Sequence, residues 1–315
     1  MNTKSFSMQH ANRSLWSMLC YFILCFYYAG VTMMVYFIDY PALSFVHENI
    51  GQVFEIFKNK MWLVNYIPAV LMVASSIAFL LNAPKKFPRW SISASVILGM
   101  VSVATTFYTY SSAVSQLPAT GFTPELQKQI FQIGFYLQII PVACQLLLAF
   151  LLLNIYLKDR KPVGRWIFII ISGLTFYSTG TGYVESFVNY PFWGSVGAKD
   201  WLPLRFSGSE ARFLGIFLIP AFLPSLLVIP LFWLRPKPIP VYFVIIFWLA
   251  QVWLFVVTAV YFVPKIQLPL NKGYSLKLIE DLNKYDFLLR GSVGLILFII
   301  TASMLVKILR QKREM

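Results

Sequence analysis

The sequence predicts an all-α membrane protein whose eight transmembrane helices form two parallel four-helix repeats. Composition is the first observation: of 315 residues, 58% are hydrophobic and only 12% are charged, whereas soluble domains are about half apolar and about a quarter charged. The second is that eight stretches are long and apolar enough to cross a hydrocarbon core as helices. The third is a tyrosine–proline motif that occurs twice with similar surroundings.

The eight apolar stretches are separated by short basic links on one side and longer polar loops on the other. We expect spans at 15–38, 62–82, 92–114, 133–156, 166–188, 213–234, 241–263 and 287–309. The first stretch is too long for a signal peptide, and no small-residue cleavage site follows it. We therefore expect it to remain as a membrane anchor.

The chain repeats itself at a nearly constant spacing. Phe26–Gly30 corresponds to Phe176–Gly180, 150 positions later. Beyond the outer loop 192–212 the spacing becomes 152, as Pro68 and Pro220 show. Colinear matches across four helices indicate a tandem duplication of one four-helix transmembrane unit.

The duplication predicts a first unit at 1–156 and a second unit at 157–315. Each unit has an even number of spans, so both enter the membrane with the same orientation. The pseudo-twofold axis should then run along the membrane normal, as in parallel-repeat transporters. Because sites in such proteins lie at the contact between repeats, we expect a site between the two units.

The net charge of +14 lies almost entirely on one side of the predicted membrane. The N-terminal tail, the three short links (83–91, 157–165 and 235–240) and the C-terminal tail hold 15 basic residues and two acidic ones. Positive charge marks the cytoplasmic side, so both termini are predicted to be cytoplasmic. Basic clusters beside spans indicate anionic lipid, not nucleic acid, as the partner.

Local signals set the helix boundaries within the first unit. The first helix should end at Tyr40-Pro41, because proline cannot donate the next helical hydrogen bond. Apolar residues at helical spacing across 50–57 predict an amphipathic helix lying at the outer interface. Thr123-Pro124-Glu125 is a helix-start signature, so a short outer helix should lead into the fourth span. The second unit follows the same order.

Polar residues collect near the outer ends of the spans. The candidate ligand-binding residues are Asp39, Tyr40, Glu185, Asn189, Tyr190, Arg212, Asp286 and Arg290. A carboxylate in the apolar register of Glu185 is costly unless it is paired or hydrated, and Arg212 and Arg290 are candidate partners. Two interpretations stay open: a structural ion pair at helix ends, or a carboxylate that binds or moves a proton or cation.

The two units differ at these polar positions. Four charged or amide residues of the second unit replace other residues of the first, which favours the second unit as the working one. The corresponding pairs are Val35 and Glu185, Gly134 and Asp286, Gln138 and Arg290, and Asp39 and Asn189.

The remaining residues give no pattern for catalysis or for metal binding. Only His10 and His47 are present, too few for bis-histidine haem or ordinary zinc sites, and the three cysteines lack ligand spacing. We assign no catalytic residue, no metal ligand and no cofactor. The Gly180-Thr181-Gly182 run is not a phosphate loop, and we expect it to allow close helix packing.

Several short motifs occupy equivalent places in the two units. They are Tyr40-Pro41 and Tyr190-Pro191 after the first helix, Pro68 and Pro220 in the second, Pro269–Tyr274 after the third, and Asp286-Phe287 with Arg290, or Gly134-Phe135, at the fourth. This pattern resembles a bacterial family of four-helix membrane proteins of unknown function, related to the anthrone-oxygenase-like domain. The family's Asn-Trp pair is absent here. The resemblance implies the four-helix architecture and a bacterial inner membrane.

Three functions are compatible with these observations. The leading expectation is a multi-pass membrane protein that binds or passes a small apolar or amphipathic ligand, or an ion, between its two repeats. One alternative is a cofactor-less membrane oxidoreductase or oxygenase acting on an aromatic or quinone-like substrate, with Glu185 or His47 as base. Another is an accessory subunit of a membrane complex. The expected partners are membrane lipid, such a ligand or ion, or a complex partner.

Overall fold

A computed structural model describes residues 3–84, 87–112, 114–121, 123–158, 161–207 and 210–311. Within these residues every regular element is helical. Eight helices are long and apolar enough to cross a membrane: Arg13–Leu43, Ile50–Asn82, Arg89–Thr109, Pro124–Tyr156, Pro162–Trp193, Ala211–Leu234, Val241–Leu270 and Leu276–Arg310. The predicted all-α fold is confirmed, and the chain is a multi-pass integral membrane protein.

The residues of the first unit form four helical runs, three of which contain a π-helical turn. The runs are α1 (Thr3–Met34), η1 (Val35–Asp39) and α2 (Tyr40–Leu43); α3 (Ile50–Met61), η2 (Trp62–Tyr66) and α4 (Ile67–Asn82); α5 (Arg89–Ser112), the 3₁₀ turn η3 (Val114–Gln116) and α6 (Leu117–Thr120); and α7 (Pro124–Gly134), η4 (Phe135–Ile139) and α8 (Ile140–Tyr156).

The residues of the second unit follow the same order, with one additional short helix in the outer loop. The runs are α9 (Pro162–Val184), η5 (Glu185–Asn189) and α10 (Tyr190–Trp193); α11 (Ala198–Arg205); α12 (Glu210–Phe213), η6 (Leu214–Leu218) and α13 (Ile219–Leu234); α14 (Val241–Val257), η7 (Thr258–Gln267) and α15 (Leu268–Leu270); and α16 (Leu276–Asp286), η8 (Phe287–Gly291) and α17 (Ser292–Gln311). The turns η1 and η5 are 150 positions apart, and η2 and η6 are 152 apart, which are the spacings of the sequence repeat.

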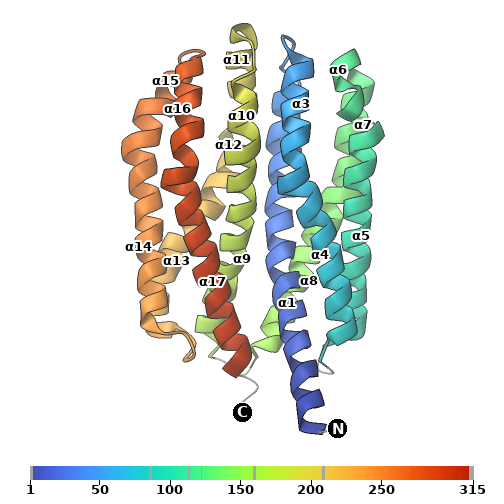
Figure 1. Cartoon of the computed structure of the whole chain (residues 1–315), viewed down its shortest axis with the longest axis vertical. Helices are drawn as coiled ribbons and strands as arrows, with labels where there is room; N and C mark the ends of the chain where they lie inside the picture. Colours follow the sequence, from blue (N-terminus) through green and yellow to red (C-terminus); the bar gives the residue numbers. More distant parts are fainter. Residues whose placement is uncertain are drawn as a thin grey trace.

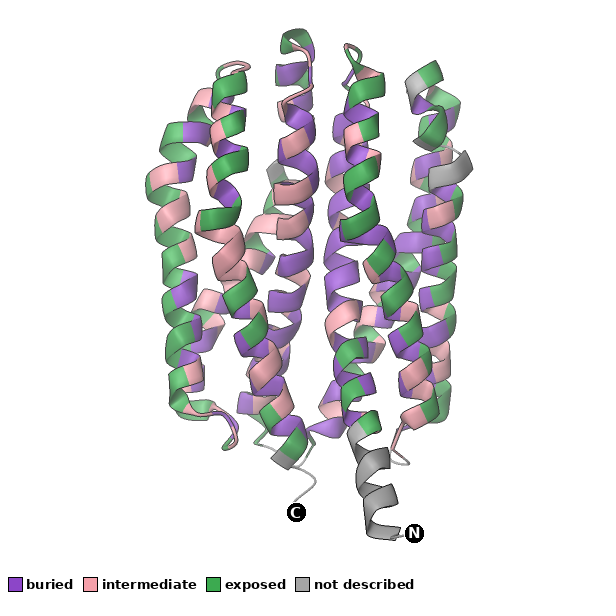
Figure 2. Cartoon of the chain, in the orientation of Figure 1, coloured by how far each residue is buried: buried purple, intermediate pink, exposed green. Residues whose placement is uncertain are grey.

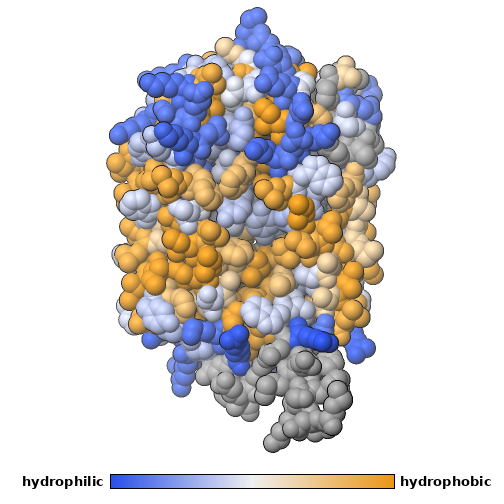
Figure 3. Space-filling model, in the orientation of Figure 1, coloured by the Kyte–Doolittle hydropathy of each residue, from blue (hydrophilic) through white to orange (hydrophobic). Residues whose placement is uncertain are grey.

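The helices stand side by side along the long axis, and the runs that carry the two chain ends approach the same end of the molecule (Figure 1). One bundle contains α1, α4, α5 and α8, and the other contains α9, α13, α14 and α17. A hydrophobic band surrounds the middle of the visible face, with hydrophilic residues above and below it (Figure 3). Burial is concentrated on the central helices, α1 and α9 among them (Figure 2).

Prolines do not end the helices as the sequence predicted. The helix of α1 continues through Tyr40-Pro41 to Leu43, because a π-helical turn precedes the proline. Tyr40 N–H donates to the carbonyl of Val35, five residues back. A proline ring clashes with the carbonyl four residues earlier in a regular α-helix, and the wider π turn relieves this clash.

The predicted interfacial helix after the first span is also wrong. The helix α3 continues without a break through η2 into α4 and stands along the bundle (Figure 1). Its apolar face packs on protein: Val53 and Phe57 are buried, and the Phe57 ring lies 6.1 Å from that of Phe192 in the other unit. Because the apolar face of α3 is buried against protein, it does not have to be buried at the lipid interface.

The two units meet most closely where α1 crosses α9. A Cβ atom added to Gly30 would overlap the backbone carbonyl of Tyr177, and one added to Gly180 would overlap that of Tyr27. Gly180 lies 150 positions after Gly30, and Tyr177 lies 150 positions after Tyr27. The two contacts are therefore equivalent when the units are exchanged. The predicted packing role is confirmed for Gly180, whereas Gly182 has no neighbour within 4 Å.

Replacing Gly30 or Gly180 by alanine should therefore loosen the contact between the units. The added methyl group meets rigid backbone, and overpacking of this kind costs about 1–3 kcal/mol. We expect a lower thermal unfolding midpoint for each variant in detergent. Gly215→Ala is the control, because nothing lies within 4 Å of that Cβ position. Equal midpoints for all three variants would show that close approach is not required.

Candidate functional site

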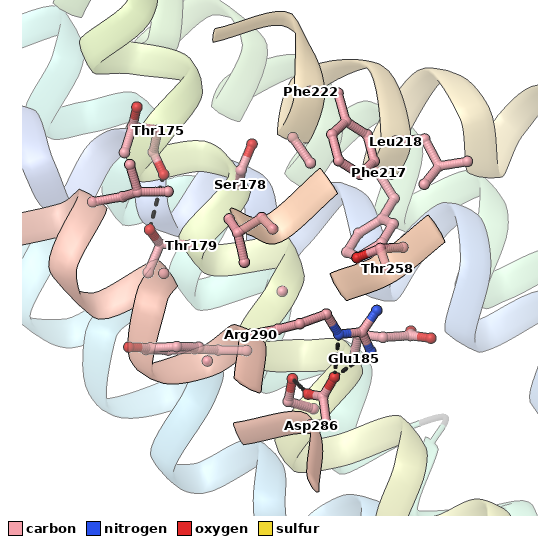
Figure 4. A pocket seen from close by; sticks show the side chains of 18 of the residues that line it. Thr175, Ser178, Thr179, Glu185, Phe217, Leu218, Phe222, Thr258, Asp286 and Arg290 are labelled. Carbon is pink, nitrogen blue, oxygen red and sulfur yellow. Dashed lines mark hydrogen bonds and ion pairs between the residues drawn. The ribbon is translucent and has the colours of Figure 1, made fainter. Parts of the chain in front are cut away.

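The candidate site is a cavity of about 160 Å³ within the second unit. Its walls come from α9 and η5 on one side, η6 and α13 on another, α14 with the start of η7, and η8 with α17. Charged residues gather at one end, away from Phe217, Leu218 and Phe222 (Figure 4). We expected a site between the two units; this cavity lies inside one of them, the one that the sequence favoured.

An ion pair forms part of the charged end. Arg290 Nε donates to Asp286 Oδ1 at 2.5 Å, and the two residues lie one helical turn apart at η8. Arg290 Nη2 donates to the Tyr190 hydroxyl at 2.9 Å, while the Ser186 hydroxyl donates to Asp286. The guanidinium lies 4.0 Å from the centre of the Phe262 ring. These contacts hold Arg290 in a fixed position at the cavity wall.

Glu185 lines the same end of the cavity and is buried, with 5% of its surface exposed. Its carboxylate accepts a hydrogen bond from Asn189 Nδ2 at 2.8 Å. The predicted partner Arg290 instead forms its ion pair with Asp286. Arg212 is exposed on α12 and is not among the residues that line the cavity. Glu185 is thus a buried carboxylate held by an amide at the cavity edge.

Arg205 is a second cation near Glu185 that the sequence analysis missed. It ends α11 in the outer loop, where its Nε donates to Asn271 Oδ1 at 2.8 Å and its guanidinium lies 5.1 Å from the Trp193 ring centre. Burial lowers the pKa of Arg205, and the Glu185 carboxylate acts in the opposite direction. The signal in the sequence was Trp193, whose ring lies against the guanidinium.

Two of the predicted site residues bridge the units at the other side of Glu185. Asn189 Nδ2 donates to Asp39 Oδ1 at 3.0 Å, and both residues are buried. Tyr40 is buried as well, but its ring faces that of Phe57, at 6.5 Å, and it does not line the cavity. The structure therefore brings Glu185, Tyr190, Asp286 and Arg290 to the cavity, Asp39 and Asn189 beside it, and Tyr40 and Arg212 elsewhere.

The cavity wall includes a residue that differs between the two units and that the sequence analysis overlooked. Ser178, in the cavity wall, corresponds to Tyr28, 150 positions earlier. Tyr28 is fully buried in the first unit, and its hydroxyl lies 2.9 Å from Thr106 Oγ1. Gln138 Nε2 donates to the same threonine oxygen at 2.8 Å. A phenol ring thus fills in the first unit the space that stays open in the second.

Two polar atoms of the cavity wall have no hydrogen-bond partner among the described residues. They are Gln251 Oε1 and Ser178 Oγ, and both are buried. A buried polar group without a partner destabilises the fold by about 1–3 kcal/mol. Such groups persist where a bound molecule satisfies them, so the wall is suited to a ligand with polar atoms.

The structure gives no indication of a metal centre in the part of the chain that it describes: no group of three or more His, Cys, Asp or Glu residues lies close enough to hold an ion. His47 lies between α2 and α3, where its backbone N–H donates to Asp200 Oδ2 at 2.6 Å. Its side chain does not line the cavity. Of the two candidate bases, Glu185 and His47, Glu185 lines the cavity.

Comparisons with known proteins add no relative. No protein family, curated protein or solved structure matches the chain. The resemblance to the anthrone-oxygenase-like family rests on the sequence motifs and stays a prediction. The function is therefore argued from the chemistry of the site, since a helical bundle alone is compatible with many functions.

The ion pair in the cavity wall predicts an asymmetric mutational response. Asp286→Leu leaves the Arg290 guanidinium, whose side chain is 19% exposed, without its partner, which should cost up to about 3–5 kcal/mol. Combining it with Arg290→Met removes both charges and should restore most of the lost stability. Thermal unfolding in detergent measures both effects. A double variant as unstable as the single one would contradict a paired, buried arginine.

Proposed function

We propose that the protein binds a small amphipathic molecule in the cavity of the second unit. The proposal rests on one comparison within the chain: Tyr28 fills a volume in the first unit, and Ser178 leaves the corresponding volume open in the second. Replacing a large residue by a small one usually destabilises a packed core. A chain that keeps such a volume open, with polar atoms in its wall, is suited to binding a ligand.

The chemistry of the wall supports an amphipathic ligand. Phe217, Phe222 and Leu254 provide an apolar surface, which suits molecules dissolved in lipid. At the charged end, Glu185 offers a carboxylate oxygen as acceptor. Arg290 has Nε and Nη2 engaged by Asp286 and Tyr190, so its remaining amino group can donate. With Arg290 as donor and Glu185 as acceptor, this end of the cavity suits a ligand group that both donates and accepts a hydrogen bond.

The volume of the cavity restricts the class of ligand further. An apolar cavity of about 150 Å³ in another protein binds benzene, and the volume here is about 160 Å³. The ligand class supported best is therefore a molecule with a single aromatic ring and a hydroxyl group. Gln251 Oε1 and Ser178 Oγ would satisfy their hydrogen-bonding capacity with the same ligand or with water bound beside it.

Filling the cavity with the side chain of the first unit tests this function. Ser178→Tyr should reduce the affinity for a fluorinated phenol by about tenfold or more, equivalent to about 1.4 kcal/mol. Fluorine NMR linewidths of the phenol, measured with protein in micelles and with empty micelles, report the binding.

The matched control is Ser292→Tyr, which adds the same ring at a residue that does not line the cavity. It should bind the phenol as the wild type does. Thermal unfolding of both variants shows whether they fold. Retained binding by a folded Ser178→Tyr variant would place the phenol outside this cavity and overturn the proposal.

A further inference from the structure

Two buried oxygen atoms at the contact between the units have no hydrogen-bond partner among the described residues: Asp39 Oδ2 and Asn189 Oδ1. Asp39 is 1% exposed and Asn189 is 3% exposed, and they occupy equivalent positions on η1 and η5. Both are acceptors if the carboxyl group is ionised. Leaving two buried acceptors without a hydrogen bond is unfavourable.

A flip of the Asn189 side-chain amide would not provide hydrogen bonds for these unpaired oxygens. Its Nδ2 already donates to Asp39 Oδ1 at 3.0 Å and to Glu185 Oε2 at 2.8 Å. Exchanging Nδ2 and Oδ1 would turn the amide oxygen toward two carboxyl groups. The orientation described is therefore the one that the surrounding acceptors select.

A single proton would satisfy both unpaired atoms. Placed on Asp39 Oδ2, it turns that oxygen into a donor, and Asn189 Oδ1 is the acceptor on the same amide. The carboxylic acid and the amide then form two antiparallel hydrogen bonds, one of which the structure already contains. Protonated carboxyl groups have this mixed donor and acceptor capacity.

We propose that Asp39 carries a proton, so that Asp39 and Asn189 form a proton-binding site at the contact between the two units. Ionised Asp39 would face the Glu185 carboxylate across one shared amide, and two like charges so close disfavour each other. Glu185 also interacts with the Arg205 guanidinium, which favours leaving the negative charge on Glu185.

Other titratable groups lie on the elements that pack against η1. The elements packed against η1 include α1, α2 and α12. Tyr40 on α2 is buried beside Phe57, and Arg212 on α12 is exposed. The proton is inferred from the two unpaired oxygens and from the nearby Glu185 carboxylate. The site does not depend on a ligand in the cavity.

Infrared spectroscopy of the purified protein in micelles tests the proposal directly. With carbon-13 incorporated into aspartate only, we expect at neutral pH a carboxylic acid carbonyl band that shifts with the label. Asp39→Asn should remove this band. The asparagine variant should fold, because an amide reproduces the shape and hydrogen bonds of the protonated acid.

Asp200→Asn is the matched control. Asp200 is also buried, but its Oδ2 accepts hydrogen bonds from the backbone N–H groups of His47 and Glu48, both at 2.6 Å, so it is not an unpaired oxygen like Asp39 Oδ2. The band must survive this change. Absence of a label-sensitive band in the wild type, or a band that appears only with labelled glutamate, would overturn the assignment of the proton to Asp39.

The pH dependence of stability gives a second measurement. The folded protein retains the proton, whereas unfolded aspartate loses it above about pH 4, so the unfolded state binds fewer protons and stability falls as the pH rises. The unfolding constant of the wild type relative to Asp39→Asn should therefore rise by up to about tenfold per pH unit. A ratio independent of pH, or stabilisation of the wild type by sodium ions in place of the pH effect, would contradict a proton at this site.

Discussion

The close contact between α1 and α9 is the constraint on which the arrangement of the two bundles depends. In lipid there is little hydrophobic drive to bring two apolar helices together, so association relies on van der Waals contact and on hydrogen bonds. Gly30 and Gly180 supply the first, because each lets a backbone carbonyl of the other helix approach. Asp39 and Asn189 supply the second, further along the same contact.

The π-helical turns decide where the polar residues lie along the bundle. Because the helices continue past their prolines, a run such as Ile50–Asn82 has 33 residues, or about 50 Å of helix, against a hydrocarbon core of about 30 Å. The ends of such runs extend into the polar region. Glu185 and Asn189 are the two ends of one π turn, which aims both side chains at the contact between helices.

Much of the fold could be predicted from the sequence, because length and hydrophobicity determine where a helix can cross a lipid bilayer. The polar residues could be found in the same way, since Glu185, Asp286 and Arg290 interrupt apolar spans. The continuation of helices through proline could not, because the rule that proline ends a helix ignores the π turn. Arg205 was missed because a loop must fold back before its guanidinium comes near Glu185.

The position of the cavity was missed for a different reason, and this reason concerns how the two similar halves of the chain differ. An open volume leaves no signal of its own in a sequence; it depends on differences in side-chain size, such as that between Tyr28 and Ser178. In the first unit Tyr28, Thr106 and Gln138 satisfy one another. In the second unit Ser178 and Gln251 retain unpaired oxygens, and ionised groups replace neutral ones. At this position the first unit is therefore closed by its own side chains, whereas the second has hydrogen-bonding capacity left in its cavity wall.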